Sequence, residues 1–395
     1  MNLAFVVQRY GADIAGGSEA HCRALAQRLA PRHSITVLTS CATDYVSWKN
    51  ARPPGDSDDG PVRVRRFPVR QVRDLRRFAD LTDAVFEGGA TSAQQDAWFQ
   101  ANGPDCPALL DHLRTEGHRY DLVLFWTFRY APSYFGVPLV ADRAVLVPTA
   151  EEDPAIELPV LRHYFRQPLA YLFMTREEQD IVSIKAGRVL EPADVIGIGL
   201  DPPEDAHGSG AALTAAGIPE RFFLYLGRVD ENKGCGTLLD YFIEYAAATP
   251  GCPPLVLAGP AKMRIPSHPS IRALGYVSDD LRGALLAQTL ALIVPSPYES
   301  LSIVLLEAWN ARVPAIVNAG CRVLVGQVRR ANGGLFYRSA DEFSEALQFM
   351  LQHADARRTM GQQGWAYVER EYRWPTVLAK VESLLDAARA RRSPS

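Results

Sequence analysis

The sequence of 395 residues lacks several features that would each define a class of protein. No segment approaches the ~20 consecutive apolar residues that span a membrane as a helix. The six cysteines are scattered without C-x-x-C spacing, which argues against a zinc site or a disulfide framework and favours reduced thiols in a cytoplasm. No G-x-G-x-x-G motif is present, which disfavours a dinucleotide-binding dehydrogenase. The net charge of -3 gives no general attraction to nucleic acid, so we expect no nucleic-acid partner.

Apolar segments of strand length alternate with helical patterns along the whole chain, which predicts an α/β protein with parallel sheets. A chain of this length is expected to form two domains, because single cores stop growing near ~250–300 residues. We place the boundary after residue 200, where an apolar segment ends in glycine and proline. Strands are expected at residues 2–8, 34–39, 62–69, 121–126, 144–147, 169–174, 222–226, 254–258, 290–294 and 315–317. Helices are expected at residues 18–29, 235–248, 279–288, 302–311 and 341–353.

Two acidic segments receive different interpretations. Residues 50–61 are rich in proline, glycine and aspartate, which predicts a surface loop. Asp56-Ser57-Asp58 within it is interpreted as solvated acid rather than as a metal-binding D-x-D, because no strand is expected before it. Glu299 and Glu307, by contrast, lie eight positions apart around a predicted helix start, where Ser300 or Ser302 can cap the helix.

The surroundings of these two glutamates predict a nucleotide-sugar site. The free N–H groups at a helix start favour phosphate, and a carboxylate one to two turns into the helix can accept hydrogen bonds from a ribose diol. Upstream, Arg228 and Lys233 follow another predicted strand in the pattern G-R-x-x-x-x-K-G. Their charge would stabilise a diphosphate as its sugar leaves. Gly16 and Gly17 follow the first strand and would let the backbone approach the ligand, although a tight turn explains them equally well.

With these motifs the chain resembles the retaining glycosyltransferases of family 4, whose two Rossmann-like domains face each other across a cleft in the GT-B architecture. The resemblance extends to residues 16–21, 257–260, 274–277, 314–317 and 372–374. It implies an acceptor-side domain at residues 1–200, completed by a C-terminal helix at residues 374–390. It also implies a nucleotide-sugar-binding domain at residues 201–373.

The resemblance further implies transfer of a sugar from a UDP- or GDP-sugar, with retention and without a metal or a separate cofactor. The acceptor would be a glycan or a lipid-linked sugar in bacterial cell-envelope or exopolysaccharide synthesis, in the cytoplasm. Arg228 and Lys233 would contact the diphosphate, Glu299 the sugar near its anomeric carbon, and Glu307 the ribose. The other implied nucleotide-sugar-binding residues are Gly16, Gly17, Gly259, Gly275, Tyr276, Val277, Ser300, Leu301, Ser302 and Ile303.

Two positions depart from the family pattern. Relatives often carry a histidine where Glu151 follows Pro148-Thr149-Ala150, and commonly a glutamate in the loop that here contains Arg322. A compensating exchange of charge across the cleft would alter donor or acceptor specificity. Surface drift and a loss of catalysis are the alternatives.

An arginine-rich stretch at residues 63–77 is interpreted as a solvated face, or as a patch that attracts an anionic membrane or an acidic glycan. Two other functions fit the same motifs: a non-catalytic nucleotide-sugar-binding protein and a nucleotide-sugar epimerase of the same fold.

Overall fold

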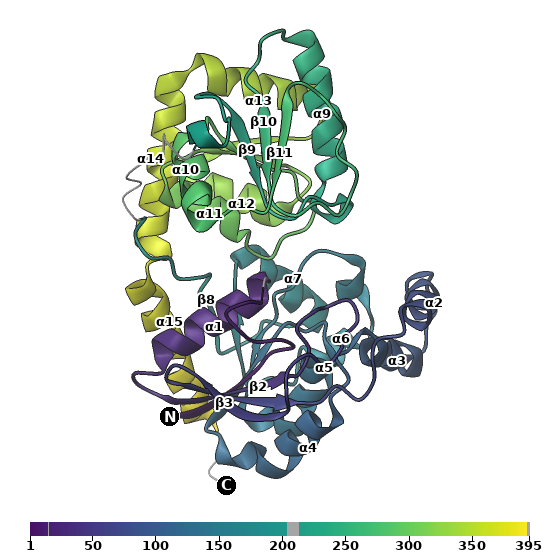
Figure 1. The fold of residues 1–395 in the computed structure, drawn as a ribbon. Coiled ribbons are helices and arrows are strands. Elements are labelled where there is room, and N and C mark those ends of the chain that lie inside the picture. Colours follow the sequence, from purple (N-terminus) through teal and green to yellow (C-terminus); the bar gives the residue numbers. More distant parts are fainter. Residues whose placement is uncertain (15, 204–212, 393–395) are drawn as a thin grey trace. The chain divides into compact units, whose positions relative to one another are not determined.

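The computed structural model describes residues 1–14, 16–203 and 213–392, and within them the chain forms two compact units (Figure 1). Unit 1 comprises Met1–Ile198 together with the residues from Val377 onward, and unit 2 comprises Gly199–Thr376. Each unit has a core of its own. Among the described residues, no helix is long and apolar enough to cross a membrane.

The sheet of unit 1 has the strand order β3-β4-β2-β1-β5-β6-β7-β8. Every neighbouring pair in it is parallel except β3 and β4. Its central strands are buried along almost their whole length, as expected of a parallel sheet that is covered on both faces. The strands are β1 (Asn2–Val6), β2 (Ser34–Ser40), β3 (Gly55–Asp59), β4 (Val62–Phe67), β5 (Leu122–Trp126), β6 (Ala144–Val147), β7 (Ala170–Phe173) and β8 (Ala193–Val195).

The helices of unit 1 come mostly from the N-terminal part of the chain. They are α1 (Gly17–Leu29), α2 (Leu75–Phe86), α3 (Ser92–Asn102), α4 (Pro107–Glu116), α5 (Ala131–Gly136), α6 (Leu161–Tyr164) and α7 (Arg176–Ala186). The exception is α15 (Trp374–Arg391), which returns to this unit from the far end of the chain. Its fully buried residues, Val377, Val381, Leu385 and Ala388, recur at helical spacing, so one apolar stripe packs the helix into the core of unit 1.

The sheet of unit 2 has the strand order β11-β10-β9-β12-β13-β14, and all of its neighbouring pairs are parallel. Its strands are β9 (Phe223–Leu226), β10 (Leu255–Ala258), β11 (Ile271–Gly275), β12 (Leu292–Val294), β13 (Ala315–Asn318) and β14 (Gly334–Tyr337). Its helices are α9 (Cys235–Ala248), α10 (Asp279–Gln288), α11 (Ile303–Asn310), α12 (Arg322–Ala331), α13 (Ala340–Gln352) and α14 (Ala354–Glu371). The prediction of parallel α/β sheets is therefore confirmed.

The predicted surface loop at residues 50–61 is wrong in part, because β3 occupies five of its residues and pairs antiparallel with β4 at the sheet edge. Two of the aspartates of β3, Asp56 and Asp59, are ion-paired rather than simply solvated. Asp56 Oδ1 accepts from Arg65 Nε at 2.6 Å, and Asp59 Oδ2 accepts from Arg23 Nε at 2.8 Å. A cross-strand charge pair with β4 and a charge pair with α1 thus stabilise a strand whose sequence carries no apolar pattern.

Candidate active site

The predicted site residues of unit 2 follow strands whose carboxyl ends meet at one edge of the sheet, which is where open parallel sheets bind their ligands. The loops after β9 and β10 touch there. Gly227 N–H donates to the Ala258 carbonyl at 3.0 Å. A Cβ at Gly259 would lie 2.0 Å from the Gly227 carbonyl oxygen, and Gly259 has a φ of +144°. Only glycine fits at position 259, so this close approach is encoded in the sequence.

The loops after β9 and β12 approach each other as closely as those after β9 and β10. This approach brings Lys233 to Glu299. Gly234 has a φ of +72°, and a Cβ on it would lie 2.4 Å from the Pro295 carbonyl oxygen. Just before it, Lys233 Nζ donates to Glu299 Oε1 at 2.7 Å. The Glu299 side chain is 13% exposed and that of Lys233 is 33% exposed. The predicted diphosphate-binding lysine and sugar-binding glutamate are therefore joined at the edge of the sheet.

Asp230 is a residue of this site that the sequence analysis missed. Its carboxylate is buried, pairs with Arg228 Nε, and accepts from the Lys233 backbone N–H at 2.9 Å. The Arg228 carbonyl accepts from the Tyr225 hydroxyl at 2.7 Å. Asp230 thus orients the guanidinium and the turn that carries the lysine. An aspartate capping the short 3-10 helix Glu231–Lys233 was the available signal.

The start of α11 differs from the predicted capped helix. Ser302 immediately precedes the helix in a left-handed conformation, with φ +65° and ψ 84°, and its side chain makes no cap. Its buried Oγ has no hydrogen-bond partner among the described residues. The turn is held from outside, because Gln327 Nε2 donates to the Leu301 carbonyl. The amides of the first helical turn are therefore not occupied by the Ser302 hydroxyl. Because a left-handed conformation is unfavourable for serine, the surrounding structure must hold Ser302 in it.

Glu307 lies on α11, as the motif predicted, and has a partner that no sequence motif indicated. Arg282 from α10 pairs through Nη2 with Glu307 Oε2. Burial raises the pKa of Glu307, while the nearby guanidinium of Arg282 opposes that rise. Arg282 therefore favours the ionised carboxylate, which is the form that accepts two hydrogen bonds from a diol.

The remaining predicted residues of unit 2 lie at the same sheet edge. Gly275 ends β11 with a φ of +68°, and its carbonyl accepts from the Gly259 N–H at 2.7 Å. Tyr276, the next residue, is 85% exposed. The predicted base-binding turn is therefore tied to the loop after β10.

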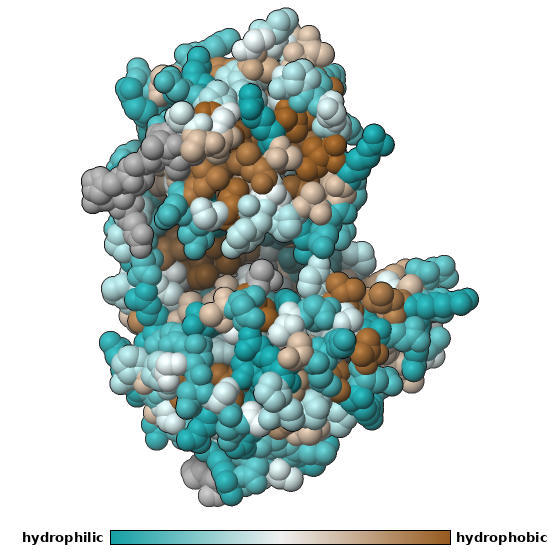
Figure 2. Space-filling model, viewed as in Figure 1, coloured by the Kyte–Doolittle hydropathy of each residue, from teal (hydrophilic) through white to brown (hydrophobic). Residues whose placement is uncertain are grey.

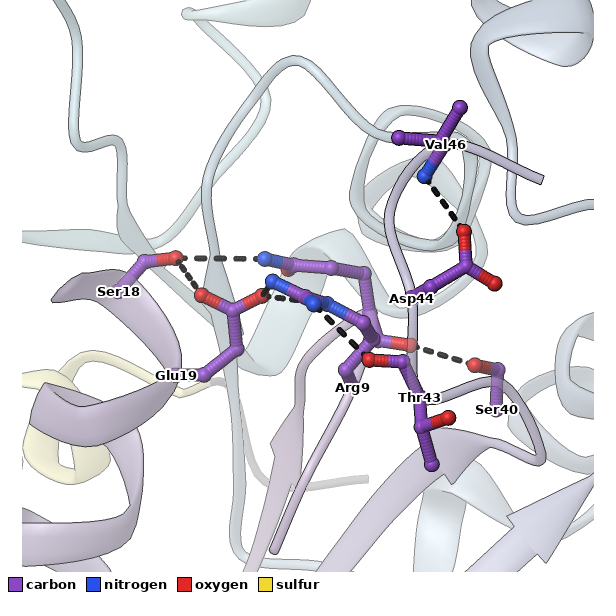
Figure 3. Close-up of polar contacts among 8 residues, drawn as sticks. Arg9, Ser18, Glu19, Ser40, Thr43, Asp44 and Val46 are labelled. Carbon is purple, nitrogen blue, oxygen red and sulfur yellow. Dashed lines mark hydrogen bonds and ion pairs between the residues drawn. The ribbon is translucent and has the colours of Figure 1, made fainter. Parts of the chain in front are cut away.

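In unit 1, the glycine loop rests on a buried ion pair that the sequence analysis also missed (Figure 3). Gly16 immediately precedes α1, and a Cβ on it would lie 2.3 Å from Glu19 Oε2. Arg9 Nε donates to Glu19 Oε1 at 2.9 Å, and Ser18 Oγ donates to Glu19 Oε2 at 2.8 Å. Arg9 also donates through Nη1 to the Thr43 carbonyl at 3.0 Å. A larger residue at position 16 would displace the Glu19 carboxylate from this position beside the loop.

The two departures from the family pattern lie in different units. Glu151 follows β6 in unit 1, whereas Arg322 begins α12 in unit 2, and the coupling between them stays a prediction. Beneath the loop with Glu151, the fully buried Glu178 accepts from the Ala150 N–H at 2.7 Å. Burial, and to a smaller degree the charge of Glu151, raises the pKa of Glu178 to about 8.

Among the described residues, no three histidine, cysteine, aspartate or glutamate side chains are grouped so that they could hold a metal ion.

Comparison with known proteins assigns part of the chain to a family. Residues 220–353 match the family described as Glycosyl transferases group 1, and this segment contains the Arg-Lys motif and both glutamates. No curated protein sequence matches the chain significantly.

The whole chain has the fold of several proteins of known structure. Anabaena HepE in complex with UDP and glucose is 15% identical, with a TM-score of 0.68 over 98% of this chain and 100% of that one. Sucrose-phosphate synthase from Thermosynechococcus elongatus is 16% identical, with a TM-score of 0.72 over 98% and 99%. The α,α-trehalose 6-phosphate synthase of Burkholderia multivorans is 13% identical, with a TM-score of 0.72 over 100% of both chains.

These identities are low, so the likeness establishes the fold. The chain has the GT-B fold, which confirms the predicted architecture, and it carries a domain of the glycosyl transferases group 1 type.

Proposed function

We propose that the protein is a retaining, metal-independent glycosyltransferase that uses a UDP- or GDP-sugar as donor and a glycan or lipid-linked sugar as acceptor. The observation that carries this proposal is the contact between Lys233 and Glu299 at the sheet edge from which the helix bearing Glu307 begins. The carboxyl edge of the unit 2 sheet would then carry three groups: a cation for the leaving diphosphate, a carboxylate for the sugar and a carboxylate for the ribose.

The proposed reaction follows from these roles. The bond between the anomeric carbon and the diphosphate oxygen breaks, and the acceptor oxygen bonds to the same face of that carbon through an oxocarbenium-like state. The acceptor's proton passes to the departing phosphate, so no dedicated base is needed. Arg228 and Lys233 stabilise the charge that develops on the diphosphate, together with the amides at the start of α11. Glu299 holds the sugar hydroxyls and Glu307 the ribose.

Two ion pairs within the site have a consequence for donor binding. Lys233 is paired with Glu299, and Arg228 with Asp230, so both cations are oriented before a donor arrives. A diphosphate competes with these carboxylates for the two cations. Because both long side chains are already held in place, donor binding costs less conformational entropy. This arrangement favours strong interaction with the additional charge of the transition state over tight binding of the ground state.

A UDP-sugar is the first donor to test, because the structure of Anabaena HepE holds UDP and glucose. Calorimetric titration with UDP-glucose, a GDP-sugar and ADP-glucose separates the bases. We expect one of the first two to bind, and binding to survive EDTA. Loss of binding on chelation that Mn²⁺ restores would contradict metal independence.

Turnover tests the catalytic assignment. Removal of one preorganised charge-stabilising group typically costs about 10²-fold or more in turnover, so Lys233→Ala is expected to slow transfer by that order. Lys185→Ala is the matched control, since Lys185 forms a partly exposed ion pair with Glu157 in unit 1. Equal turnover of the two variants would contradict the assignment of Lys233.

Product analysis separates transfer from the two alternatives. A non-catalytic binding protein would bind the donor without forming product, and the replacement of the common histidine by Glu151 is the observation that favours it. An epimerase would change the sugar without any acceptor. Transfer requires an acceptor-dependent release of nucleoside diphosphate, which neither alternative produces.

Cytoplasmic location and peripheral contact with an anionic membrane belong to the same proposal, but the arginine-rich stretch supports the contact weakly. Arg65 is paired with Asp56, and Arg70 with Asp105, so part of its positive charge is neutralised within the unit. Flotation with vesicles that contain anionic lipid tests the contact directly.

A further inference from the structure

A pocket with a volume of about 330 Å³ lies in unit 1 beside the base of α2 and α3, and none of the predicted site residues lines it. We call it the arm pocket. Its walls come from the segment between β4 and α2, from the start of α2 and from the end of α3. Figure 2 shows hydrophobic residues beside hydrophilic ones on the protruding arm that α2 and α3 form. Val72 at the pocket is 55% exposed.

Arginine dominates the arm pocket. Three guanidinium groups and two carboxylates line it, those of Arg70, Arg73, Arg77, Asp74 and Asp105. Both carboxylates are already engaged by neighbouring groups. Asp105 accepts from Arg70 Nε at 2.8 Å, and Asp74 caps α2 by accepting from the Arg77 backbone N–H at 3.0 Å. The arginines therefore exceed the acids by one charge.

Arg73 is a half-buried cation that neutral groups hold in place. Its Nη2 donates to the side-chain oxygen of Asn102 at 2.9 Å, and its guanidinium lies 5.1 Å from the Trp48 ring and 4.8 Å from the Phe78 ring. Its Nε is buried and has no hydrogen-bond partner among the described residues. Burial lowers the pKa of Arg73, and the charge of Asp44 opposes this only in part. Within the part of the chain that the structure describes, no carboxylate contacts the guanidinium to replace the lost hydration. An anion in the pocket would supply the missing charge.

Arg77 provides the accessible group for such an anion. Its side chain is exposed and lines the pocket, and among the described residues its guanidinium makes no hydrogen bond or ion pair. A guanidinium presents parallel N–H donors that match the oxygens of a phosphate or a carboxylate. Arg77 and the uncompensated Arg73 thus place positive charge at two points of one pocket.

One wall of the arm pocket belongs to a loop at the carboxyl edge of the unit 1 sheet. Trp48 lines the pocket, and the same loop after β2 contains Thr43, whose carbonyl accepts from Arg9 beneath the glycine loop. The Arg73 N–H also donates to the Ser47 carbonyl of that loop at 2.7 Å. The pocket is thus built into the same edge of the sheet as the glycine loop.

We propose that the arm pocket binds a phosphate or carboxylate group and, resting on the proposed function, that this group belongs to the acceptor. Its volume lies within the range of small-molecule sites. An acceptor that carries such a group would be held through Arg77, apart from the residues that hold the donor. The pocket would then select anionic acceptors over neutral ones.

A pair of adjacent arginines gives a matched test, because Arg77 lines the pocket and Arg76, equally exposed on α2, does not. Glucose 1-phosphate and glucuronate are titrated calorimetrically into the wild type, Arg77→Gln and Arg76→Gln, with UDP present in excess to occupy the donor site. We expect Arg77→Gln to weaken binding of at least one probe by about 10-fold or more, the range for a charge-assisted hydrogen bond. Arg76→Gln should leave it unchanged. If the wild type binds neither soluble probe nor vesicles that contain phosphatidic acid, or if both variants lose binding equally, the proposal is overturned.

Two further measurements identify the source of the anion and separate this proposal from the proposed function. Flotation with phosphatidylcholine vesicles containing phosphatidic acid is compared with the glucose 1-phosphate titration. Loss in Arg77→Gln for vesicles alone assigns a lipid headgroup, and loss for the soluble probe assigns a free acceptor. UDP-glucose and GDP-sugar titrations are run on the same preparations. Anion binding that depends on Arg77, in a protein that binds neither donor, would refute the proposed function and leave the pocket assignment standing.

Discussion

The pair between Arg282 and Glu307 gives the most informative prediction, because one substitution tests both its energetics and its position in the site. Burial raises the pKa of Glu307, and Arg282 opposes this rise. Arg282→Met keeps a long apolar side chain and removes the charge. The carboxylate would then be held in a poorly solvated place without a counter-charge, which destabilises unit 2 whenever Glu307 is ionised.

The size of the effect can be worked from the contact. Two unit charges ~4 Å apart near a protein surface attract by about 4 kcal/mol. The Arg282 side chain is 34% exposed, so water replaces part of that attraction when the guanidinium is removed. We therefore take about half, ~2 kcal/mol. A domain of the size of unit 2 loses about 2–4 °C of Tm per kcal/mol, so the expected fall is about 4–8 °C near neutral pH.

The pH dependence has a definite sign. The pKa of Glu307 in the folded state lies above its usual value, and loss of Arg282 raises it further. The folded state then binds a proton that the unfolded state has released, so stability falls as pH rises through this window. The destabilisation by Arg282→Met should therefore be smaller at about pH 5 than at about pH 7.5.

Differential scanning calorimetry of the unit 2 transition measures this effect. Glu307→Gln and the double variant are the controls, because without the carboxylate no uncompensated negative charge remains. The double variant should recover most of the Tm that Arg282→Met loses. A loss that is the same at both pH values, or that persists in full in the double variant, would refute the reasoning.

Three further predictions concern single residues. Burial raises the pKa of Glu178 to about 8, so the Tm of wild-type unit 1 should fall as pH rises from about 5 to about 8. Glu178→Gln should flatten this pH profile of Tm. Parallel profiles in the wild type and the variant would contradict the raised pKa of Glu178. Gly234→Ala places a Cβ against the Pro295 carbonyl, whereas Gly251→Ala strains a similar φ of +77° in open space. Gly251→Ala should therefore cost about 1 kcal/mol in urea unfolding and Gly234→Ala clearly more; equal costs would contradict the close approach. Glu307→Ala should chiefly weaken nucleotide affinity in calorimetry, and a lower turnover at unchanged affinity would overturn its ribose role.

The sequence by itself determined the framework of each unit. The helix at Cys235–Ala248 has the predicted bounds, as does the helix at Asp279–Gln288, which Ser278 caps through its side chain. Alternation of such helices with short apolar strands leaves few options other than parallel α/β layers. The same patterns placed Glu299 in a loop and Glu307 on a helix.

The sequence analysis failed where an element has little apolar periodicity. β3 consists of glycine, serine and aspartate, and its partners are arginines on another strand and on α1. Periodicity reports which side of an element faces a core, so a strand whose side chains face charged partners escapes it. The helices α2 and α3 were not predicted either, although α2 buries Val85 and α3 buries Trp98 and Phe99.

Only the tertiary structure decided which charges are paired at the site. Lys233 and Glu299 are 66 positions apart, and Arg282 and Glu307 are 25 apart. Each pair depends on the order of the strands in the sheet and on how closely the loops after them approach. The left-handed Ser302 is a further case, because a serine before a helix locally favours a cap, whereas Gln327 from another helix holds the turn. Local patterns fix the elements, but neighbours distant in sequence fix the side chains that meet at their ends.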